Sequence, residues 1–264
     1  MNRIEESPEE IRNYYKKRAT TDPYATSPDY NLREIEIEYL SRSLKDNSTI
    51  LDVGCGNGYS ILSFASKYTS SFTGIDFVPE MIEQANTLKN TFLLKGSVEF
   101  KCGDVTKLEF DNDTFDIVIS ERCLLNLPTR DMQWQAIREI ARVLKPDGVY
   151  LMLEGTVQGL ERLNELRLMF NLDPIPDADP QYNWFSNKFD EDEMVITALQ
   201  SFRYLERVQR FGMYYLLSRI VHPLLVAPEQ PQYNAKINEI ARLIADKIPD
   251  FKNIGHVALF VFRK

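Results

Sequence analysis

The feature that most constrains the fold is an alternation of short apolar runs with longer amphipathic segments between Thr49 and Glu154. Short apolar runs are typical of strands, and the segments between them are long enough for helices that connect parallel strands by right-handed crossovers. The pattern predicts an α/β fold, with a doubly wound, mostly parallel sheet and helices on both faces. The expected strands are residues 50–53, 72–75, 98–102, 117–119 and 149–153, and the expected helices are residues 59–68, 79–88 and 132–144.

Outside this alternation the sequence predicts mainly helices. Ser7 followed by Pro8 predicts the N-cap and first turn of a helix over residues 7–15, and an apolar stripe from Leu32 to Leu44 predicts a second helix. Beyond Gly155 the expected helices are residues 160–170, 213–221 and 235–247, and the expected strands are residues 203–211 and 256–262.

Composition excludes several classes of function. The formal net charge is −8, and no dense cluster of lysine and arginine is present, which argues against nucleic acid as a partner. The first ten residues lack the order of a secretory signal and no apolar run reaches membrane-spanning length, so we expect a cytoplasmic protein without a membrane partner. Three widely spaced cysteines without a CxxC pair predict no disulfide framework or zinc site, and no acidic cluster predicts another metal.

A glycine-rich turn follows the first expected strand, in the sequence Ile50-Leu-Asp-Val-Gly-Cys-Gly-Asn-Gly58. Glycine lacks a Cβ atom, so the backbone of such a turn can approach a nucleotide-like ligand at the carboxyl end of the strand. The GxGxG spacing, with Asp52 two residues ahead, differs from the GxGxxG that holds a pyrophosphate in dinucleotide sites. It therefore favours a ligand without a diphosphate.

Polar residues also follow the next three strands. Asp76 comes about 20 residues after the glycines, where a carboxylate accepts hydrogen bonds from both hydroxyls of a ribose. Its alternative role is to cap the helix that follows. Asp104 and Val105 lie in a turn after the third strand, where they are expected near the edge of an adenine, and the fourth strand ends in Ser120 and Glu121.

In this order, the motifs LDVGCGNG, GIDFVPEMIEQA, CGDV, FDIVIS and VLKPDGVYLM resemble those of the class I S-adenosylmethionine-dependent methyltransferases. The resemblance covers residues 49–154 and implies a seven-stranded sheet whose last strand is antiparallel. Residues 203–211 and 256–262 then become the last two strands, and the helices between them form a cap inserted late in the chain. The implied regions are an N-terminal helical lid (1–48), a cofactor-binding core (49–155), and cap insertions with the last two strands (156–264).

The resemblance also implies S-adenosylmethionine as the cofactor, together with residues that contact it. These are Asp52, Gly54, Cys55 and Gly56 for the methionine part, Asp76 for the ribose, Phe77, Met81, Asp104 and Val105 for the adenine, Ser120 and Glu121 beside the sulfonium, and Tyr14, Tyr15 and Arg18 in the lid.

The acceptor side is less defined by the sequence. His222 lies in the expected cap and suits proton transfer at neutral pH, so it is one catalytic candidate, and Glu121 is the other. Packing or capping by His222, and an ion pair of Glu121 with Arg122, are open alternatives. The candidates for acceptor contacts are Asn126, Glu154, Tyr214, Tyr215 and Arg219, with the aromatic segment 182–186; a capping role for Glu154 and simple packing of the aromatics stay open, and His256 is expected to be structural.

These observations predict a methyltransferase with a small-molecule substrate. O-methylation of a sugar, a sugar-linked metabolite or another natural product is favoured over N-methylation of a small amine or amide, on the breadth of the family. A nicotinamide-dependent oxidoreductase is one alternative, against which the GxGxG spacing argues. A noncatalytic partner subunit that binds S-adenosylmethionine is another, against which the intact Asp52, Asp76 and Asp104 argue. A homodimer is left open.

Overall fold

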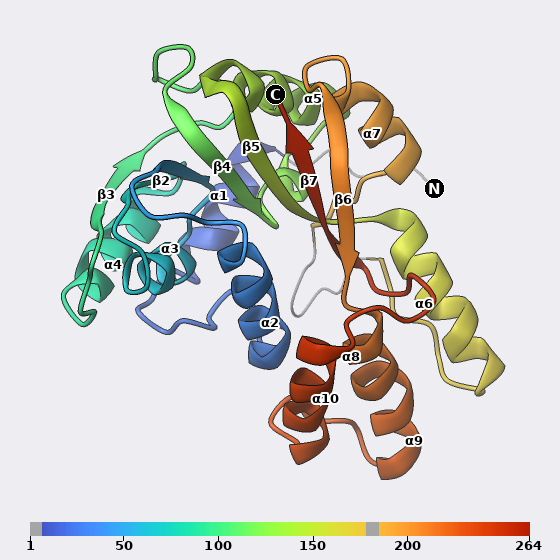
Figure 1. Cartoon of the computed structure of the whole chain (residues 1–264). Coiled ribbons are helices and arrows are strands. Elements are labelled where there is room, and N and C mark those ends of the chain that lie inside the picture. The colour runs from blue at the N-terminus through green and yellow to red at the C-terminus, as the bar shows by residue number, and fades with distance from the viewer. Residues whose placement is uncertain (1–6, 178–184) are drawn as a thin grey trace.

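A computed structural model describes residues 7–177 and 185–264 of the chain. It contains a seven-stranded sheet in the order β3–β2–β1–β4–β5–β7–β6 (Figure 1). The strands are β1 (Thr49–Val53), β2 (Ser71–Asp76), β3 (Ser97–Cys102), β4 (Phe115–Glu121), β5 (Leu144–Gly155), β6 (Tyr204–Arg210) and β7 (Val257–Arg263).

The strand directions bring the carboxyl ends of the parallel strands, which carry Asp52, Asp76 and Glu121, to one edge of the sheet. β1 to β5 run parallel to their neighbours, whereas β7 runs antiparallel to both β5 and β6. The seven-stranded sheet with an antiparallel last strand is therefore confirmed. The carboxyl ends of the parallel strands and the first residue of β7 meet at the same edge, because Gly155 of β5 pairs with Val257.

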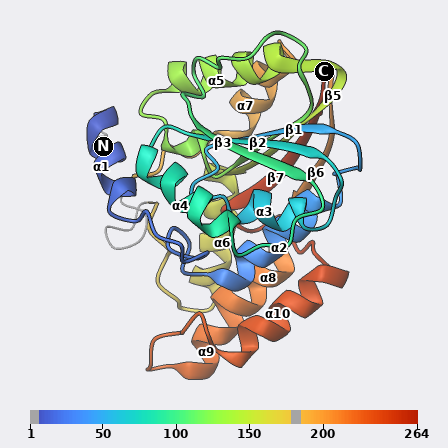
Figure 2. The ribbon, with the colours of Figure 1, turned by 90° about the vertical axis from the view of Figure 1, so that its left-hand side faces the viewer.

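Apolar residues cover both faces of the sheet, as expected for buried parallel strands. One cluster contains Ile50, Ile119 and Leu151 and packs under α2 (Tyr30–Ser41), α3 (Tyr59–Ala65) and α4 (Pro79–Lys89). The other contains the alternating residues on the same strands, such as Leu51 and Val118, and packs under α5 (Arg130–Val143) and α7 (Glu191–Ala198). Figure 2 shows α5 and α7 on one side of the sheet and α2 and α3 on the other.

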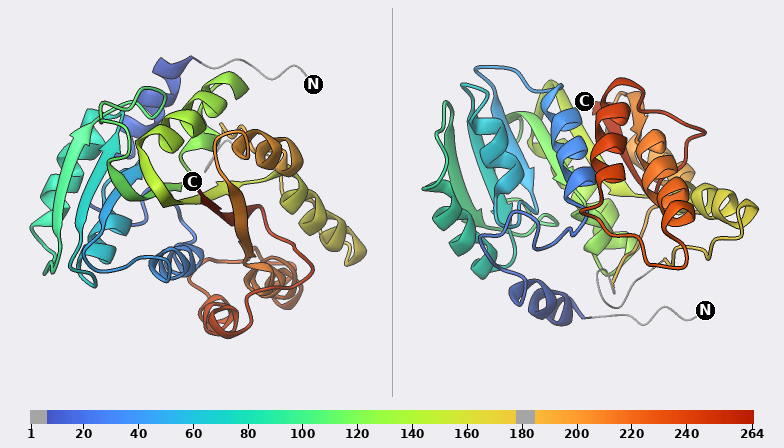
Figure 3. Two further views of the ribbon diagram at one scale, coloured as in Figure 1. Left: turned by 45° about the horizontal axis from the view of Figure 1, so that its top comes forward. Right: turned by 90° about the horizontal axis from the view of Figure 1, so that it is seen from below.

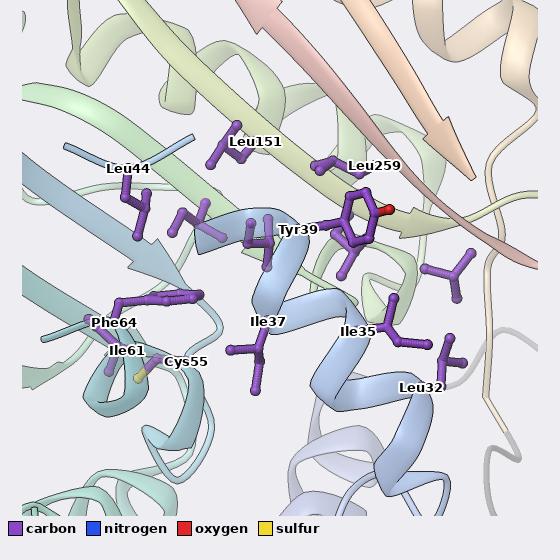
Figure 4. Close-up of a cluster of buried hydrophobic side chains, with 14 of the residues drawn as sticks. Leu32, Ile35, Ile37, Tyr39, Leu44, Cys55, Ile61, Phe64, Leu151 and Leu259 are labelled. Carbon is purple, nitrogen blue, oxygen red and sulfur yellow. The ribbon is translucent and has the colours of Figure 1, made fainter. Parts of the chain in front are cut away.

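The N-terminal helices pack against the core in different ways. α1 (Pro8–Lys16) begins with a capping box between Ser7 and Glu10, as the sequence predicts for its N-terminus, and Lys16 forms an ion pair with Glu80 of α4 at 2.7 Å. The apolar stripe of α2 is buried: Figure 4 shows its side chains, Ile37 and Tyr39 among them, with Phe64 of α3 and residues of the sheet. α1 thus lies at the margin of the fold and α2 is part of its core.

Residues 211–256, which we call the cap, connect β6 to β7. The cap contains α8 (Gly212–Leu216), a π-helical turn η2 (Leu217–Val221), α9 (His222–Val226) and α10 (Lys236–Lys247). These helices stand together beyond one end of the sheet, next to α2 (Figures 1 and 3). Tyr39 of α2 donates a hydrogen bond to the carbonyl of Ala245 at 3.3 Å, so the cap is anchored to the core.

Two elements differ from the sequence predictions. β5 begins at Leu144, earlier than expected, because Leu144 pairs with Phe115 of β4 before a register shift. The helix α7 was not predicted, since it is short and its first turn is entirely acidic; Asp190 caps it by accepting from the backbone N–H of Glu193. α6 (Val157–Met169) lies where a helix was expected. Residues 182–184 of the predicted aromatic segment lie outside the described residues.

Candidate active site

A cleft of about 300 Å³ opens at the carboxyl ends of the parallel strands. Its walls come from α1, the loop before α2, the turn after β1, the loop after β4, the start of β7 and the cap. The volume is at the lower end of the range for small-molecule sites. The lid, core and cap regions therefore all contribute residues to one cleft.

The glycine turn after β1 forms the floor of the cleft. The N–H groups of Gly54 and Cys55 both donate to the carbonyl of Ile75, at 2.8 and 2.9 Å, so the turn is fixed to the end of β2. Gly54 has a φ of +72°, and a Cβ atom there would lie 2.3 Å from the Sγ of Cys123. Only glycine fits this position, because both the dihedral and the space exclude a side chain.

Asp76 lies at the end of β2, and both of its carboxylate oxygens accept backbone hydrogen bonds. The N–H of Gly56 donates to Oδ2 and the N–H of Val78 donates to Oδ1, each at 2.9 Å. Burial raises the pKa of Asp76 to about 6, although these two hydrogen bonds lower it. The carboxylate is therefore held in the cleft and keeps lone pairs for a ligand.

A second buried carboxylate, Asp52, lies near the ion pair between Arg33 of α2 and Glu121 of the neighbouring strand β4. Glu121 accepts a hydrogen bond from Ser60 at 2.5 Å, and its Oε1 lies 3.2 Å from Nη1 of Arg33. Burial raises the pKa of Asp52 well above its ordinary value, and the carboxylates of Glu121 and Asp76 raise it further, whereas Arg33 lowers it. Among the described residues, Asp52 Oδ1 and Glu121 Oε1 are buried without a hydrogen-bond partner.

The loop after β4 is held in an unusual conformation. Glu154, at the end of β5, accepts hydrogen bonds from the N–H groups of Cys123, Leu124 and Leu125 at 3.2, 2.9 and 3.1 Å. Burial raises the pKa of Glu154 to about 7, and those hydrogen bonds lower it. Arg122 has a φ of +51°, a region that costs energy for a residue with a side chain. The side chain of Arg122 consequently points into the cleft and forms an ion pair with Glu36 at 3.0 Å.

The far end of the cleft, toward the cap, is lined by basic residues. Arg219 forms an ion pair with Asp29, the residue that caps α2. Lys188 contacts the carboxylate of Asp177 at 2.8 Å. His256, directly before β7, also lines this end. Burial lowers the pKa of His256 well below its ordinary value, and Lys188, Arg219 and Arg122 lower it further, so its imidazole is neutral at pH 7.

The structure brings many of the sequence-predicted residues to this cleft, and their roles stay predictions. They are Asp52, Gly54, Cys55, Gly56, Asp76, Phe77, Met81, Glu121, Asn126, Arg219 and, from the lid, Tyr14, Tyr15 and Arg18.

Three expected cofactor residues do not line it. Ser120 is fully buried and its hydroxyl hydrogen-bonds that of Tyr150 at 2.8 Å, because the alternation of the strand directs it into the sheet interior. Asp104 accepts from the backbone N–H and the hydroxyl of Thr106 in an exposed turn. Val105 packs into the core beneath α5.

Four expected catalytic or acceptor residues also lie behind the cleft wall. His222 is buried at the start of α9 and hydrogen-bonds Asn238, so the structure favours the packing alternative. Tyr214 donates to Asp29 at 2.6 Å, and the ring of Tyr215 packs against that of His256, with 5.0 Å between centroids. Glu154 accepts hydrogen bonds from backbone N–H groups of the loop after β4, so it has a capping role. The segment that it caps differs from the helix that follows β5.

Sequence reasoning missed Asp29, Arg33 and Lys188 and treated His256 as structural. One signal for His256 was present: an antiparallel strand begins at the edge where the parallel strands end, so the residue before it lies near the site. Asp29 and Arg33 carry no such signal, because their ion-pair partners Arg219 and Glu121 are remote in the sequence. Lys188 pairs with the nearer Asp177, but no motif marks that pair as part of a site.

Residues 50–148 match the family model described as a methyltransferase domain. With the strand order and the glycine turn, this match defines a class I S-adenosylmethionine-dependent methyltransferase domain. S-adenosylmethionine is the cofactor of this class.

Among curated proteins, the chain is similar to a demethylmenaquinone methyltransferase of Leptospira interrogans, with 34% identity over 54% of this chain and 58% of the relative. It is also similar to a 27-O-demethylrifamycin SV methyltransferase of Amycolatopsis mediterranei, with 32% identity over 40% of this chain and 38% of the relative. The chain thus matches 58% of the length of the first of these relatives and 38% of the second.

Solved structures are similar over nearly the whole chain. A protein of Pyrococcus horikoshii has a TM-score of 0.63 and 20% identity, covering 95% of this chain and 98% of that one. A chain of the complex between the Trm112 methyltransferase activator of Haloferax volcanii and a candidate methyltransferase has a TM-score of 0.64 and 19% identity, covering 96% of both chains. At these identities the likeness shows the fold, cap included.

The residues at the floor of the cleft fit S-adenosylmethionine. Its amino group and sulfonium are cationic, and Oδ1 of Asp52 and Oε1 of Glu121 are buried without a hydrogen-bond partner among the described residues. A buried acceptor without a partner costs about 1–3 kcal/mol, which a cationic ligand would offset.

Within residues 7–177 and 185–264, no group of three or more His, Cys, Asp or Glu is arranged to hold a metal ion, and no helix has the length and apolar character to cross a bilayer.

Proposed function

We propose that the protein is an S-adenosylmethionine-dependent methyltransferase that transfers the methyl group to a small-molecule acceptor. The observation that carries this proposal is the pair of buried carboxylates, Asp52 and Asp76, at the ends of β1 and β2 on either side of the glycine turn. Asp76 would hold the ribose hydroxyls, and Asp52 with Glu121 would hold the amino group. Phe77 and Met81 supply apolar surface for the adenine.

The chain's own residues would act mainly by positioning. Arg33 and Ser60 hold Glu121, and Glu154 fixes the loop that carries Arg122 and Asn126 into the cleft. Tyr15 of the lid lines the same cleft, where it would help to exclude water. Alignment of acceptor and methyl group can supply a large part of the rate in such a displacement. The cofactor contributes the activated methyl group.

Within this function we propose an oxygen acceptor on a metabolite, a sugar or another natural product. The names of the relatives support a small-molecule acceptor, and one specifies an oxygen position while another, from Arabidopsis thaliana, specifies N-methylation of phosphoethanolamine. N-methylation is therefore the second candidate. The net charge of −8 supports the absence of a nucleic-acid substrate.

The test is transfer of label from methyl-deuterated S-adenosylmethionine to the small molecules of a metabolite extract, followed by mass spectrometry. The Asp76→Ala variant serves as the inactive control, and Asp111→Asn, an exposed carboxylate outside the cleft, as the matched active control. A product labelled by the wild type and by Asp111→Asn, and absent with Asp76→Ala, is the expected result. Failure of the wild type to bind S-adenosylhomocysteine by calorimetry would overturn the proposal. Binding without transfer to any compound would favour the noncatalytic partner subunit.

A further inference from the structure

The cleft has opposite electrostatic character at its two ends. At the floor, the carboxylates of Glu121 and Asp76 raise the pKa of Asp52. Of the described residues, Arg33 is the one cation that lowers this pKa, so the electrostatic field at Asp52 is negative. At the cap end, Lys188, Arg219 and Arg122 all lower the pKa of His256, and no carboxylate of the described residues raises it. The field at the imidazole is therefore positive.

The basic residues at the cap end are built into the fold. The side chain of Arg219 is only 14% exposed and its ion-pair partner Asp29 only 7% exposed. Asp29 also accepts hydrogen bonds from Tyr214 and from the N–H of Leu32, so its charge is already well satisfied. Among the described residues Arg219 donates a side-chain hydrogen bond through Nη2 alone, to Asp29. The guanidinium also lies over the ring of Tyr233, 5.2 Å from its centroid, and Arg219 lines the cleft.

Lys188 adds a second cation at the same end. Its side chain is 6% exposed, whereas its partner Asp177 is 57% exposed. Nζ of Lys188 also donates to the backbone carbonyl of Asp177 and, at 3.1 Å, to the hydroxyl of Ser186. Lys188 is thus a buried, hydrogen-bonded cation that lines the cap end of the cleft.

The third cation, Arg122, is directed into the cleft by the left-handed backbone described above. Nη1 of Arg122 donates to Ser27 at 3.1 Å and Nη2 pairs with Glu36, which is fully buried. Burial raises the pKa of Glu36 to about 7, and Glu121 raises it further, whereas Arg122 and Arg33 lower it. Arg122 therefore lines the cleft as a partly buried cation that contacts Ser27 and Glu36.

We propose that the acceptor is an anion, whose carboxylate or phosphate group binds at the cap end of the cleft between Arg122, Lys188 and Arg219, next to the neutral imidazole of His256. This inference rests on the proposed function and names its substrate class. The cationic donor would occupy the negative floor and the anionic acceptor the positive end, so each substrate meets a complementary field. Nδ1 of His256 is buried without a hydrogen bond among the described residues, and His256 lines the cleft.

The chain contains only two histidines, so His256 can report directly on this site. The experiment is a proton NMR titration of both imidazoles, in protein saturated with S-adenosylhomocysteine, with chloride, sodium sulfate or sodium acetate added at equal ionic strength. Sulfate stands for a phosphate group and acetate for a carboxylate. A unit charge a few ångströms away at an effective dielectric near 20 changes a pKa by roughly one pH unit or more. We expect one of the two anions to raise the pKa of His256 by that amount, while that of His222, behind the wall, does not move.

Variants of the protein test whether the change in the pKa of His256 arises at the proposed anion site. Lys188→Gln should raise the pKa of His256 in chloride and weaken the effect of the anion, whereas Lys145→Gln, which removes a lysine paired with Asp116 at 2.9 Å outside the cleft, should change neither. His222→Gln assigns the two signals. No effect of either anion on His256, in protein that binds S-adenosylhomocysteine, would overturn the anionic acceptor and leave the proposed function standing. Failure to bind S-adenosylhomocysteine would overturn the proposed function itself.

The labelled product of the methyl-transfer experiment provides a second test of the proposal. Product retained by a strong anion exchanger at pH 7 agrees with the proposal, and its release after phosphatase treatment assigns a phosphate rather than a carboxylate. A labelled product that the exchanger does not retain would overturn the proposal.

Discussion

Replacing Asp52 by asparagine should make the protein more stable and, at the same time, a poorer binder of the donor. Asp52 is 2% exposed, stands beside Glu121 and Asp76, and has a buried Oδ1 without a hydrogen-bond partner among the described residues. Asparagine has nearly the same shape but no charge, so the substitution removes the unfavourable burial of a carboxylate. Asparagine keeps an unpaired Oδ1, so the gain comes from the charge alone, for which about 1–3 kcal/mol is expected because burial of a charged group costs more than burial of a neutral one. For a chain of this size, each kcal/mol changes Tm by roughly 2–4 °C, so a rise of about 2–12 °C is expected.

The effect should depend on pH with a defined sign. The pKa of Asp52 is higher in the folded than in the unfolded protein, so the folded state takes up a proton more readily. The stability associated with this group is complete below the unfolded pKa and is lost as pH rises through the folded one. The advantage of the asparagine variant should therefore be largest at pH 8 and shrink toward pH 5.

Thermal unfolding at both pH values, with and without S-adenosylhomocysteine, measures the two effects together. Loss of a charge-assisted hydrogen bond of about 1.5–3 kcal/mol weakens binding roughly 10- to 150-fold, so the ligand should stabilise the variant less than the wild type. Asp111→Asn, on the exposed surface, is the matched control and should change neither value. A variant that unfolds at the same or a lower temperature than the wild type at pH 8 would refute the reasoning.

Three further outcomes follow from the same contacts. Asp76→Ala should weaken binding of S-adenosylhomocysteine at least 10-fold, and wild-type affinity should fall as pH drops below about 6, where Asp76 becomes protonated; calorimetry at pH 5 and 7.5 checks both. Glu154→Ala leaves three backbone N–H groups without their acceptor and should destabilise the protein by about 3 kcal/mol or more, seen as a lower midpoint in urea; an unchanged midpoint would contradict the capping role. Tyr214→Phe removes the 2.6 Å hydrogen bond to Asp29 and should cost about 1.5–3 kcal/mol in the same assay, whereas Tyr204→Phe, on the exposed edge strand, should have little effect.

The core of the fold could be predicted from sequence because its signals are local. The apolar run of β1, the glycines after it and the crossover helices each lie within a short segment, and together they predict parallel strands connected by helices. The position of Asp52 and Asp76 at the floor of the cleft was predictable for the same reason, since Asp52 is the penultimate residue of β1 and Asp76 the last of β2. The placement of Ser120 was missed because the alternation of β4 directs it to the interior, where Tyr150 of β5 receives it.

The cap end could not be predicted in the same way. Arg219 finds its partner in Asp29, far away in the sequence, and Arg33 finds Glu121. No periodicity or spacing encodes such pairs, because they depend on how α2 packs between the sheet and the cap. His222 attracted attention as a rare titratable residue, yet its burial beside Asn238 gives it a packing role.

The way the cap is attached bears on how such a protein can change its substrate. The chain leaves the sheet after Arg210 and returns at Val257, and Arg210 is paired with Ala258, so the two ends of the cap are neighbours in one antiparallel ladder. To the sheet, the cap is a long hairpin loop. Insertions and replacements within such a loop leave the pairing of β6 with β7 intact. Changes in the cap that keep its contacts with the core, such as the hydrogen bonds of Tyr214 to Asp29 and of Tyr39 to Ala245, therefore leave the sheet as it is.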